Sequence, residues 1–237
     1  MKFEKILIDC QDPKDNSNII RKFATVKVTV SKSSDVYKTL LAEAKKLSLN
    51  VSSGAANESA LSRGDERKLI DSFGGLLAEK GWVDYINSRF DNIASPTPFT
   101  VASKQIDIKL TNGELLEVRS SFIRNGVKFG ICNKSYNFKN IGPYSNSIKP
   151  GEMQKNLYCG VLFETQKTNI LSSDEIIFYL VGSSTWEMMI NIGIDTELNA
   201  WDAIALAPGK YKVVYYKDSM DLIQFNDHIE SLGYTKK

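Results

Sequence analysis

The chain has 237 residues, 42% hydrophobic and 24% charged, which are ordinary globular proportions with room for one large domain or two small ones. Its formal net charge of +2 is too small for the whole molecule to attract nucleic acid as a strongly basic domain does, so any anionic partner must be bound locally. The chain has neither a run of about 18 apolar residues nor the long uncharged apolar start of a signal peptide, which predicts a cytoplasmic protein with no membrane partner.

The cysteines and the single histidine exclude several kinds of site. Cys10, Cys132 and Cys159 are widely spaced, and no Cys or His pair stands at the separations that zinc sites use. We therefore expect reduced thiols. His228 is expected on the surface of a helix near the C-terminus, where it does not serve as the base of a catalytic triad.

The first 60 residues are expected to form an N-terminal extension of a core that spans residues 61–237. The extension holds two strand candidates, Lys5–Cys10 and Phe23–Val30, and the second alternates polar and apolar residues with a period of two. These strands could form a small separate sheet packed on the core. A helical pattern follows at Val36–Leu47.

The segment Gly64–Trp82 is typical of a helix that ends at Gly81. An apolar stripe at helical spacing is formed by Ile70, Phe73 and Leu77. The pair Gly74–Gly75 costs about 1 kcal/mol per glycine relative to alanine, which indicates close packing against another element. Glu66 stands four residues before Ile70 and is expected to point to the buried side, where a carboxylate needs a metal ion or a donor.

The rest of the chain completes a mixed α/β (α+β) pattern. Further strands are expected at Leu157–Glu164, Glu175–Val181 and Lys210–Tyr216, and a final helix at about Ser219–Leu232. Together with the hairpin described next, these elements predict a mixed central β-sheet flanked by helices.

The turn Thr111-Asn112-Gly113 decides how the hairpin around it pairs. A three-residue loop with Gly113 in the left-handed conformation pairs Leu110 with Glu114 and places Asp107 opposite Glu117. A two-residue loop would put these two acids on opposite faces. The first register also gathers the apolar residues on one face, so we expect it.

Two carboxylates on facing strand positions have their Cβ atoms about 4.5 to 5.5 Å apart and repel each other unless a cation lies between them. Oxygen ligands without histidine favour Mg²⁺, with Mn²⁺ as an alternative, and no organic cofactor is expected. A second turn, Asn125-Gly126, predicts a further hairpin that brings Lys128 to the carboxylate face. The alternative is a hairpin whose polar face is simply solvated.

The segment between residues 133 and 158 mixes basic and aromatic residues, a combination that suits phosphates and base faces. Its candidate DNA-binding residues are Lys134, Tyr136, Lys139, Tyr144, Lys149 and Lys155. The alternative is a solvated loop whose aromatic side chains pack locally.

The order of a helix acid in Gly64-Asp-Glu-Arg67, then Asp107, then Glu117-Val118-Arg119 resembles the PD-(D/E)XK nuclease superfamily of restriction endonucleases and junction resolvases, over roughly residues 64–131. The resemblance implies a restriction-endonuclease-like core, with Asp107, Glu117 and Glu66 as metal ligands and Arg119 at the position usually held by lysine. Ile106 replaces the proline that names the motif.

The resemblance implies a Mg²⁺-dependent endonuclease that hydrolyses double-stranded DNA, most like a type II restriction enzyme acting as a homodimer. Arginine does not lose its proton at working pH, so Arg119 is expected to hold a phosphate while the metal activates water, or while Lys128 or Lys109 takes the role of the motif lysine. The alternatives are a structure-specific junction nuclease and a non-catalytic DNA- or protein-binding module on the same fold.

Overall fold

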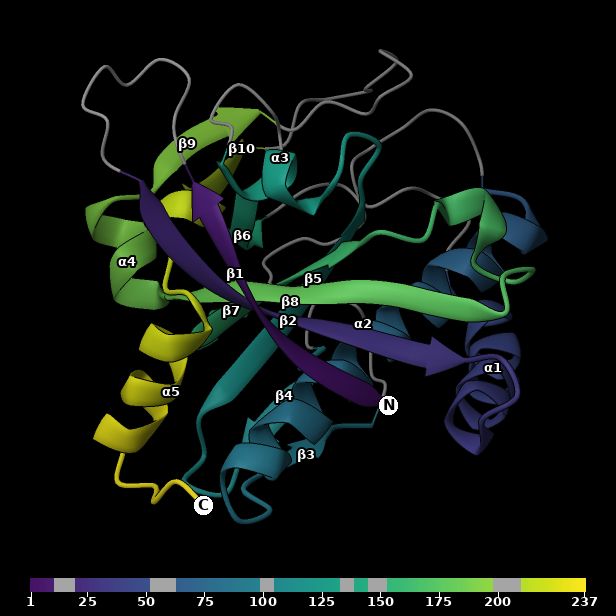
Figure 1. The fold of residues 1–237 in the computed structure, drawn as a ribbon, viewed down its shortest axis with the longest axis horizontal. Helices are drawn as coiled ribbons and strands as arrows, with labels where there is room; N and C mark the ends of the chain where they lie inside the picture. Colours follow the sequence, from purple (N-terminus) through teal and green to yellow (C-terminus); the bar gives the residue numbers. More distant parts are fainter. Residues whose placement is uncertain (11–19, 52–62, 99–104, 133–138, 145–152, 198–209) are drawn as a thin grey trace.

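A computed structural model of the chain describes residues 1–10, 20–51, 63–98, 105–132, 139–144, 153–197 and 210–237 (Figure 1). Their main feature is a seven-stranded sheet with the spatial order β1-β2-β8-β7-β5-β4-β3. Its strands are β1 (Lys2–Cys10), β2 (Arg21–Ser31), β3 (Ala94–Pro96), β4 (Ile108–Leu110), β5 (Leu115–Phe122), β7 (Leu157–Phe163) and β8 (Glu175–Thr185). Neighbouring strands run antiparallel except for the parallel pair β5–β7.

A second, three-stranded sheet and the helices complete the described fold. The small sheet has the order β6-β10-β9, with β6 (Lys139–Tyr144), β9 (Ile194–Glu197) and β10 (Lys210–Tyr215). The helices are α1 (Asp35–Ser48), α2 (Asp65–Arg89), α3 (Val127–Cys132), α4 (Trp186–Asn191) and α5 (Leu222–Ser231), with 3-10 turns η2 (Lys167–Asn169) and η3 (Tyr216–Asp218). A mixed central sheet flanked by helices is therefore confirmed.

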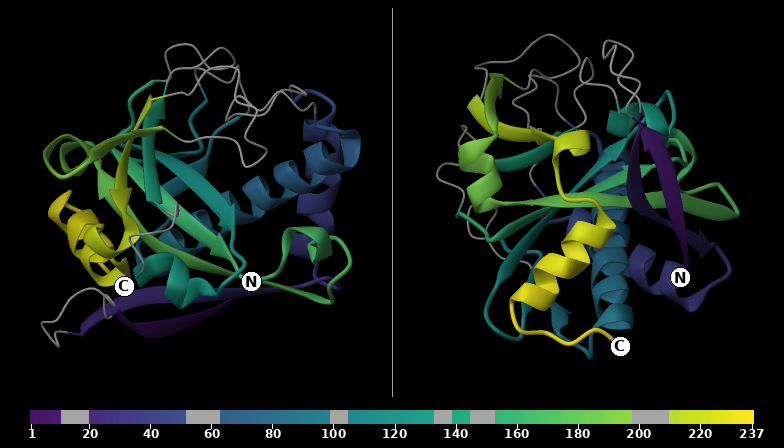
Figure 2. Two further views of the ribbon diagram at one scale, coloured as in Figure 1. Left: turned by 90° about the horizontal axis from the view of Figure 1, so that it is seen from above. Right: turned by 60° about the vertical axis from the view of Figure 1, so that its left-hand side comes forward.

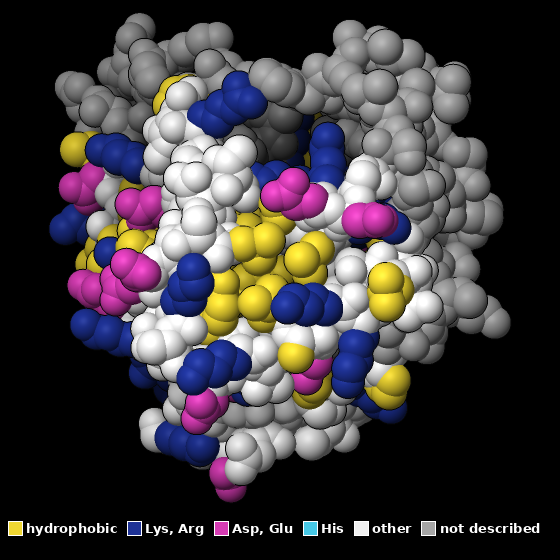
Figure 3. All heavy atoms as spheres, turned by 90° about the vertical axis from the view of Figure 1, so that its right-hand side faces the viewer, with side chains coloured by type: hydrophobic (Ala, Val, Ile, Leu, Met, Phe, Trp, Pro, Cys, Tyr) yellow, Lys and Arg dark blue, Asp and Glu magenta, His cyan; other side chains and the backbone are white. Residues whose placement is uncertain are grey.

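Strand β7 shows how the two faces of the central sheet are covered. Its buried side chains alternate between two cores. Cys159 and Val161 face the larger core, which contains residues of α1, α2 and α5, whereas Tyr158 and Leu162 face clusters with α3, α4 and the small sheet. Figure 2 shows α1 and α2 together at one end of the molecule, and Figure 3 views that end, where apolar side chains gather near the middle with lysines and arginines around them.

Helix α2 does not end at Gly81, as the sequence predicts, but continues to Arg89. A Cβ atom on Gly81 would lie 2.7 Å from the ring of Phe178, so this glycine allows the helix to approach the sheet rather than ending the helix. Gly74 has the same role, because a Cβ atom there would lie 3.1 Å from the ring of Phe122. The close packing expected at the glycine pair is thus confirmed for Gly74, while Gly75 faces open space.

The N-terminal strands belong to the central sheet and do not form a separate one. β1 pairs with β2 along its whole length, and β2 pairs with β8. A disulfide joins Cys10 at the end of β1 to Cys132 at the end of α3, so the expectation of reduced thiols is wrong for this pair. Cys159 is free and buried. No helix in the described ranges is long and apolar enough to span a membrane.

Residues 127–132 form the helix α3, and the predicted hairpin at Asn125-Gly126 is wrong. Val127 and Ile131 are four residues apart, so they lie on one face of a helix as well as on one face of a strand. Both side chains are buried against the smaller cluster, which includes Cys10 and Tyr216. β5 pairs instead with β7, all of whose residues are buried.

Candidate active site

The hairpin between β4 and β5 has the predicted register. Gly113 has φ +100°, and its amide donates to the carbonyl of Leu110 at 2.9 Å. The amide of Leu110 donates to the carbonyl of Glu114 at 2.9 Å, and Ile108 pairs with Leu116. One residue beyond the end of β4, the same register places Asp107 across from Glu117.

Asp107 ends the pairing between β4 and β5. Its Oδ2 atom accepts a hydrogen bond from the backbone amide of Val118 at 2.7 Å. If the antiparallel pairing continued, the Val118 amide would donate to the carbonyl of Ile106, because the backbone amides of alternate β5 residues point toward β4. That carbonyl instead accepts from the side chains of Thr97 and Gln105, the latter at 2.7 Å. The Asp107 carboxylate therefore lies against the open edge of β5.

Glu117 lies under the surface between two cations. Only 3% of the residue is exposed. Its Oε1 atom is 3.0 Å from a guanidinium nitrogen of Arg119, and its Oε2 atom is 2.9 Å from Nζ of Lys155. The Lys155 side chain is fully buried, and its backbone amide donates to the hydroxyl of Tyr158 at 3.1 Å. Because Tyr158 pairs with Glu117 across β5 and β7, the parallel strand pair brings Lys155 to Glu117.

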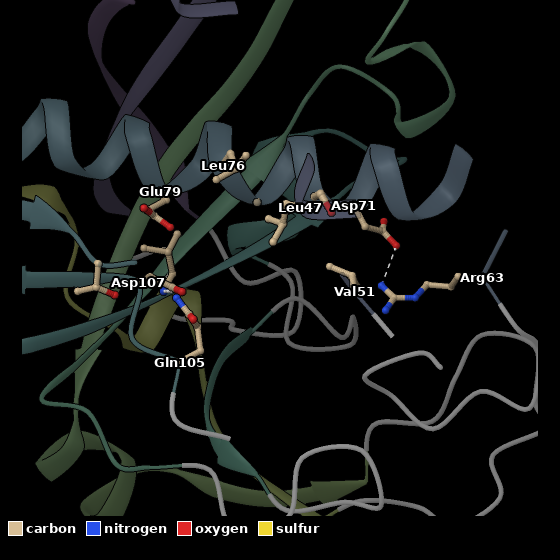
Figure 4. Close-up of a pocket in the computed structure, with 12 residues that line it drawn as sticks. Leu47, Val51, Arg63, Asp71, Leu76, Glu79, Gln105 and Asp107 are labelled. Carbon is tan, nitrogen blue, oxygen red and sulfur yellow. Dashed lines mark hydrogen bonds and ion pairs between the residues drawn. The ribbon is translucent and has the colours of Figure 1, made fainter. Parts of the chain in front are cut away.

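A pocket of about 360 Å³ opens beside Asp107, on the side that faces α2. Figure 4 shows Glu79 pointing from α2 toward Asp107, with Gln105 next to it. At the other end of the pocket, Arg63 and Asp71 form an ion pair at 3.3 Å.

The acids around Asp107 hold their protons unusually well. Burial and, to a smaller extent, the charges of Asp107, Glu43 and Glu117 raise the pKa of Glu79 to about 8. Burial raises the pKa of Asp107 to about 7, with a second contribution from the charge of Glu117, against the lowering effect of the Val118 amide. The charge of Glu117 from β5 thus acts on Asp107, and the charge of Asp107 acts in turn on Glu79 from α2, so that the negative charge of one acid favours the proton on the next.

Glu79 was not among the predicted site residues, and Glu66 is not where the sequence places it. Glu66 is exposed in the first turn of α2, roughly 20 Å along the helix axis from Glu79. The sequence does carry a signal for Glu79, because it is an acid within the apolar run between Phe73 and Trp82. The predicted helix end at Gly81 hid it, since that end leaves Glu79 near a terminus rather than at mid-helix.

The lysines expected to replace the motif lysine also lie elsewhere. Lys128 is exposed on α3, which packs with the smaller cluster rather than beside Asp107. Lys109 is exposed on β4, where it pairs with Leu115. Lys155 occupies the place beside Glu117, although the sequence indicated only that it belongs to a basic loop.

The candidate DNA-binding residues are partly inside the molecule. Lys139 is 7% exposed in β6, with its ammonium 4.9 Å from the ring centre of Tyr215, and burial lowers its pKa. Tyr144 ends β6 and pairs with Tyr211. Lys155 is buried and does not form part of a surface loop. The remaining three, Lys134, Tyr136 and Lys149, lie outside the described residues.

No group of three or more His, Cys, Asp or Glu side chains in the described ranges is close enough together to hold a metal ion by itself. The acids near Asp107 are instead divided between the two faces of the sheet. Glu79 approaches from α2, whereas Glu117 shares its face with Tyr158 and the small sheet.

Comparisons with known proteins leave the family open. The chain is 33% identical over 134 residues to an uncharacterized protein of the archaeon Methanocaldococcus jannaschii, an alignment that covers 51% of this chain and 47% of that protein. The chain therefore spans about half the length of this relative. No family model matches the sequence. No solved structure matches it either.

Proposed function

We propose that the chain is a metal-dependent endonuclease that hydrolyses phosphodiester bonds in double-stranded DNA, as a homodimeric type II restriction enzyme does. The observation that carries the proposal is the Asp107 carboxylate at the edge of β5, where it accepts from the Val118 amide at 2.7 Å next to Glu117, with Lys155 2.9 Å from the Glu117 carboxylate. Two acids and a lysine at one strand edge are the side chains that the resemblance to PD-(D/E)XK nucleases requires.

The side chains present fit a magnesium or manganese ion. Mg²⁺ is commonly held by one or two carboxylates together with water and substrate phosphate, so Asp107 and Glu117 suffice as protein ligands. Burial and then the charge of Glu117 raise the pKa of Asp107, and a divalent cation would offset both effects. When bound, such an ion polarises a phosphoryl oxygen and lowers the pKa of a coordinated water. Glu79, rather than the exposed Glu66, is the helix acid on the Asp107 side.

Lys155 replaces the lysine that the motif lacks. Arg119 keeps its proton at any working pH, so its role is to bind the phosphate and balance developing negative charge. A lysine ammonium can both donate hydrogen bonds and exchange a proton with a nearby water. We assign that role to Lys155 in place of Lys128 or Lys109, because it is the lysine that contacts Glu117.

A non-catalytic DNA- or protein-binding module is the second candidate, and one observation favours it. Each oxygen of Glu117 faces a different cation, Arg119 or Lys155, which is also how a structural ion-pair network satisfies a buried carboxylate. In that case the hairpin acids would support the sheet and no DNA would be cleaved.

Cleavage of supercoiled plasmid DNA with Mg²⁺ or Mn²⁺, and with a chelator instead, separates the two candidates. The informative variant is Asp107→Asn, because asparagine can still accept the Val118 amide and so preserve the hairpin. We expect metal-dependent cleavage by the wild type, none by Asp107→Asn, and wild-type cleavage by the matched control Glu66→Gln. Wild-type cleavage by Asp107→Asn would refute the nuclease proposal, and no cleavage of plain, methylated or branched DNA by the wild type would favour the module.

A further inference from the structure

A second pocket, of about 280 Å³, lies near the C-terminal end of α2, away from the candidate active site. It is bounded by the C-terminal turn of α2, the start of α5, the strands β1 and β2, and the last residues of the chain. Tyr85 lines this pocket and Glu79 lines the other, and the two pockets share no residue. It therefore needs an explanation of its own.

The charged residues that line the second pocket are all cations. Lys5 comes from β1, Arg89 from the last turn of α2 and Lys236 from the C-terminal segment. Lys236 pairs with Glu230 at 3.5 Å at the surface, and Glu230 does not line the pocket. The charge of Asp221, which also does not line it, acts on Tyr85. Three cations from distant parts of the chain repel each other here, and a bound anion would offset that repulsion by attracting all three.

The floor of the pocket is polar and buried. Tyr85 is 2% exposed and Asn226 is 8% exposed. The amide nitrogen of Asn226 donates to the Tyr85 hydroxyl at 2.9 Å, so the two polar side chains hold each other in place. The Arg89 guanidinium lies 5.8 Å from the centre of the Tyr85 ring, so it is held next to this floor.

We propose that this pocket binds the phosphate group of an organic phosphomonoester. A phosphomonoester has three terminal oxygens, and the pocket offers one guanidinium and two ammonium groups as charged donors. The remaining wall is formed by Val26, Leu222 and Ile223, which suits the organic part of the ligand better than water. This inference does not depend on the nuclease proposal.

Isothermal titration calorimetry with adenosine 5′-monophosphate, and separately with inorganic phosphate, tests the proposal at an ionic strength held constant with sodium chloride. The variants are Lys5→Ala and Arg89→Gln, each of which removes one charge from the pocket. Lys38→Ala is the matched control, because Lys38 is an exposed lysine on α1 paired only at 3.9 Å with Asp35. Asp107→Asn separates this pocket from the candidate active site.

We expect the wild type, Lys38→Ala and Asp107→Asn to bind the nucleotide alike, and Lys5→Ala and Arg89→Gln to bind it about tenfold more weakly, the loss of one charge-assisted hydrogen bond each. Inorganic phosphate should bind more weakly than the nucleotide, with the same order among variants. No binding by the wild type, or equal binding by all five proteins, would overturn the proposal. An equal loss in Lys38→Ala would also overturn it, because it would show general attraction to a basic surface.

Discussion

Replacing Lys155 by methionine tests whether the ion pair with Glu117 is as tightly held as the structure indicates. The substitution keeps most of the side-chain volume and removes the charge, so it leaves a buried carboxylate with one cation instead of two. Removing one partner of a buried ion pair costs about 3 to 5 kcal/mol. Because Arg119 still lies 3.0 Å from the other oxygen, we expect the lower value, about 3 kcal/mol.

Urea unfolding gives this free energy directly, and for a chain of this length the same change lowers the melting temperature by roughly 6 to 12 °C. The control is Lys80→Met, which breaks a half-exposed pair with Asp84 on α2 and should cost about 0.5 kcal/mol. The double variant Glu117→Gln with Lys155→Met should lose less than the sum of the two single variants, because both substitutions break the same ion pair. If Lys155→Met destabilised the protein no more than Lys80→Met, the ion pair would not be the buried interaction described, and its use in the proposed mechanism would fail.

Three further predictions concern pH, the disulfide and the helix glycines. The folded pKa of Glu79 is raised from 4.5 to about 8, so the folded state binds an extra proton between these values and the unfolding free energy should fall as pH rises through them. Glu79→Gln should make the unfolding free energy depend less steeply on pH between pH 5 and 9. An unchanged slope would contradict the assignment. Reducing the bond between Cys10 and Cys132, which are 122 residues apart, should lower the unfolding free energy by about 5 kcal/mol, and the double serine variant should match the reduced wild type and no longer respond to reductant. Gly81→Ala should destabilise the protein by about 1 to 3 kcal/mol because its Cβ meets a phenyl ring, whereas Gly75→Ala, in open space on the same helix, should stabilise it by up to about 1 kcal/mol; equal effects in thermal unfolding would refute the packing argument.

The register of the β4–β5 hairpin could be predicted from sequence because its determinants are local. Gly113 fixes the loop, and the alternation of Ile108 and Leu110 with polar residues fixes the face. The same local information placed α1, β7, β8 and α5 within a few residues of their bounds. α5 is delimited by a capping box in which Asp221 accepts from backbone amides and Gln224 returns the bond, and such a signal lies within four residues.

The partners of Asp107 and Glu117 could not be predicted, because they come from distant segments. Lys155 reaches Glu117 only because β5 pairs in parallel with β7, and nothing in the residues near Glu117 specifies that strand. The sequence after β5 suited either a hairpin strand or a helix, and burial against β1 and the disulfide partner selects the helix. The choice between Glu66 and Glu79 also depends on tertiary packing. Helix α2 continues past Gly81, where it packs against Phe178, although the sequence alone predicts that the helix ends there.

The parallel pair β5–β7 also matters for comparing this chain with others. A parallel connection has to cross from one end of the sheet to the other, and here the crossover contains α3 and β6 before it returns at Lys155. Relatives can differ in the length of this crossover outside its anchored elements, in which Cys132 of α3 is bonded to Cys10 and Asn140 of β6 donates to the Ser184 hydroxyl of β8. Homologues should therefore be aligned in two independent blocks, one on the Asp107–Arg119 hairpin and one on the start of β7, and a substitution of Glu117 in one block should be accompanied by a substitution of Lys155 in the other.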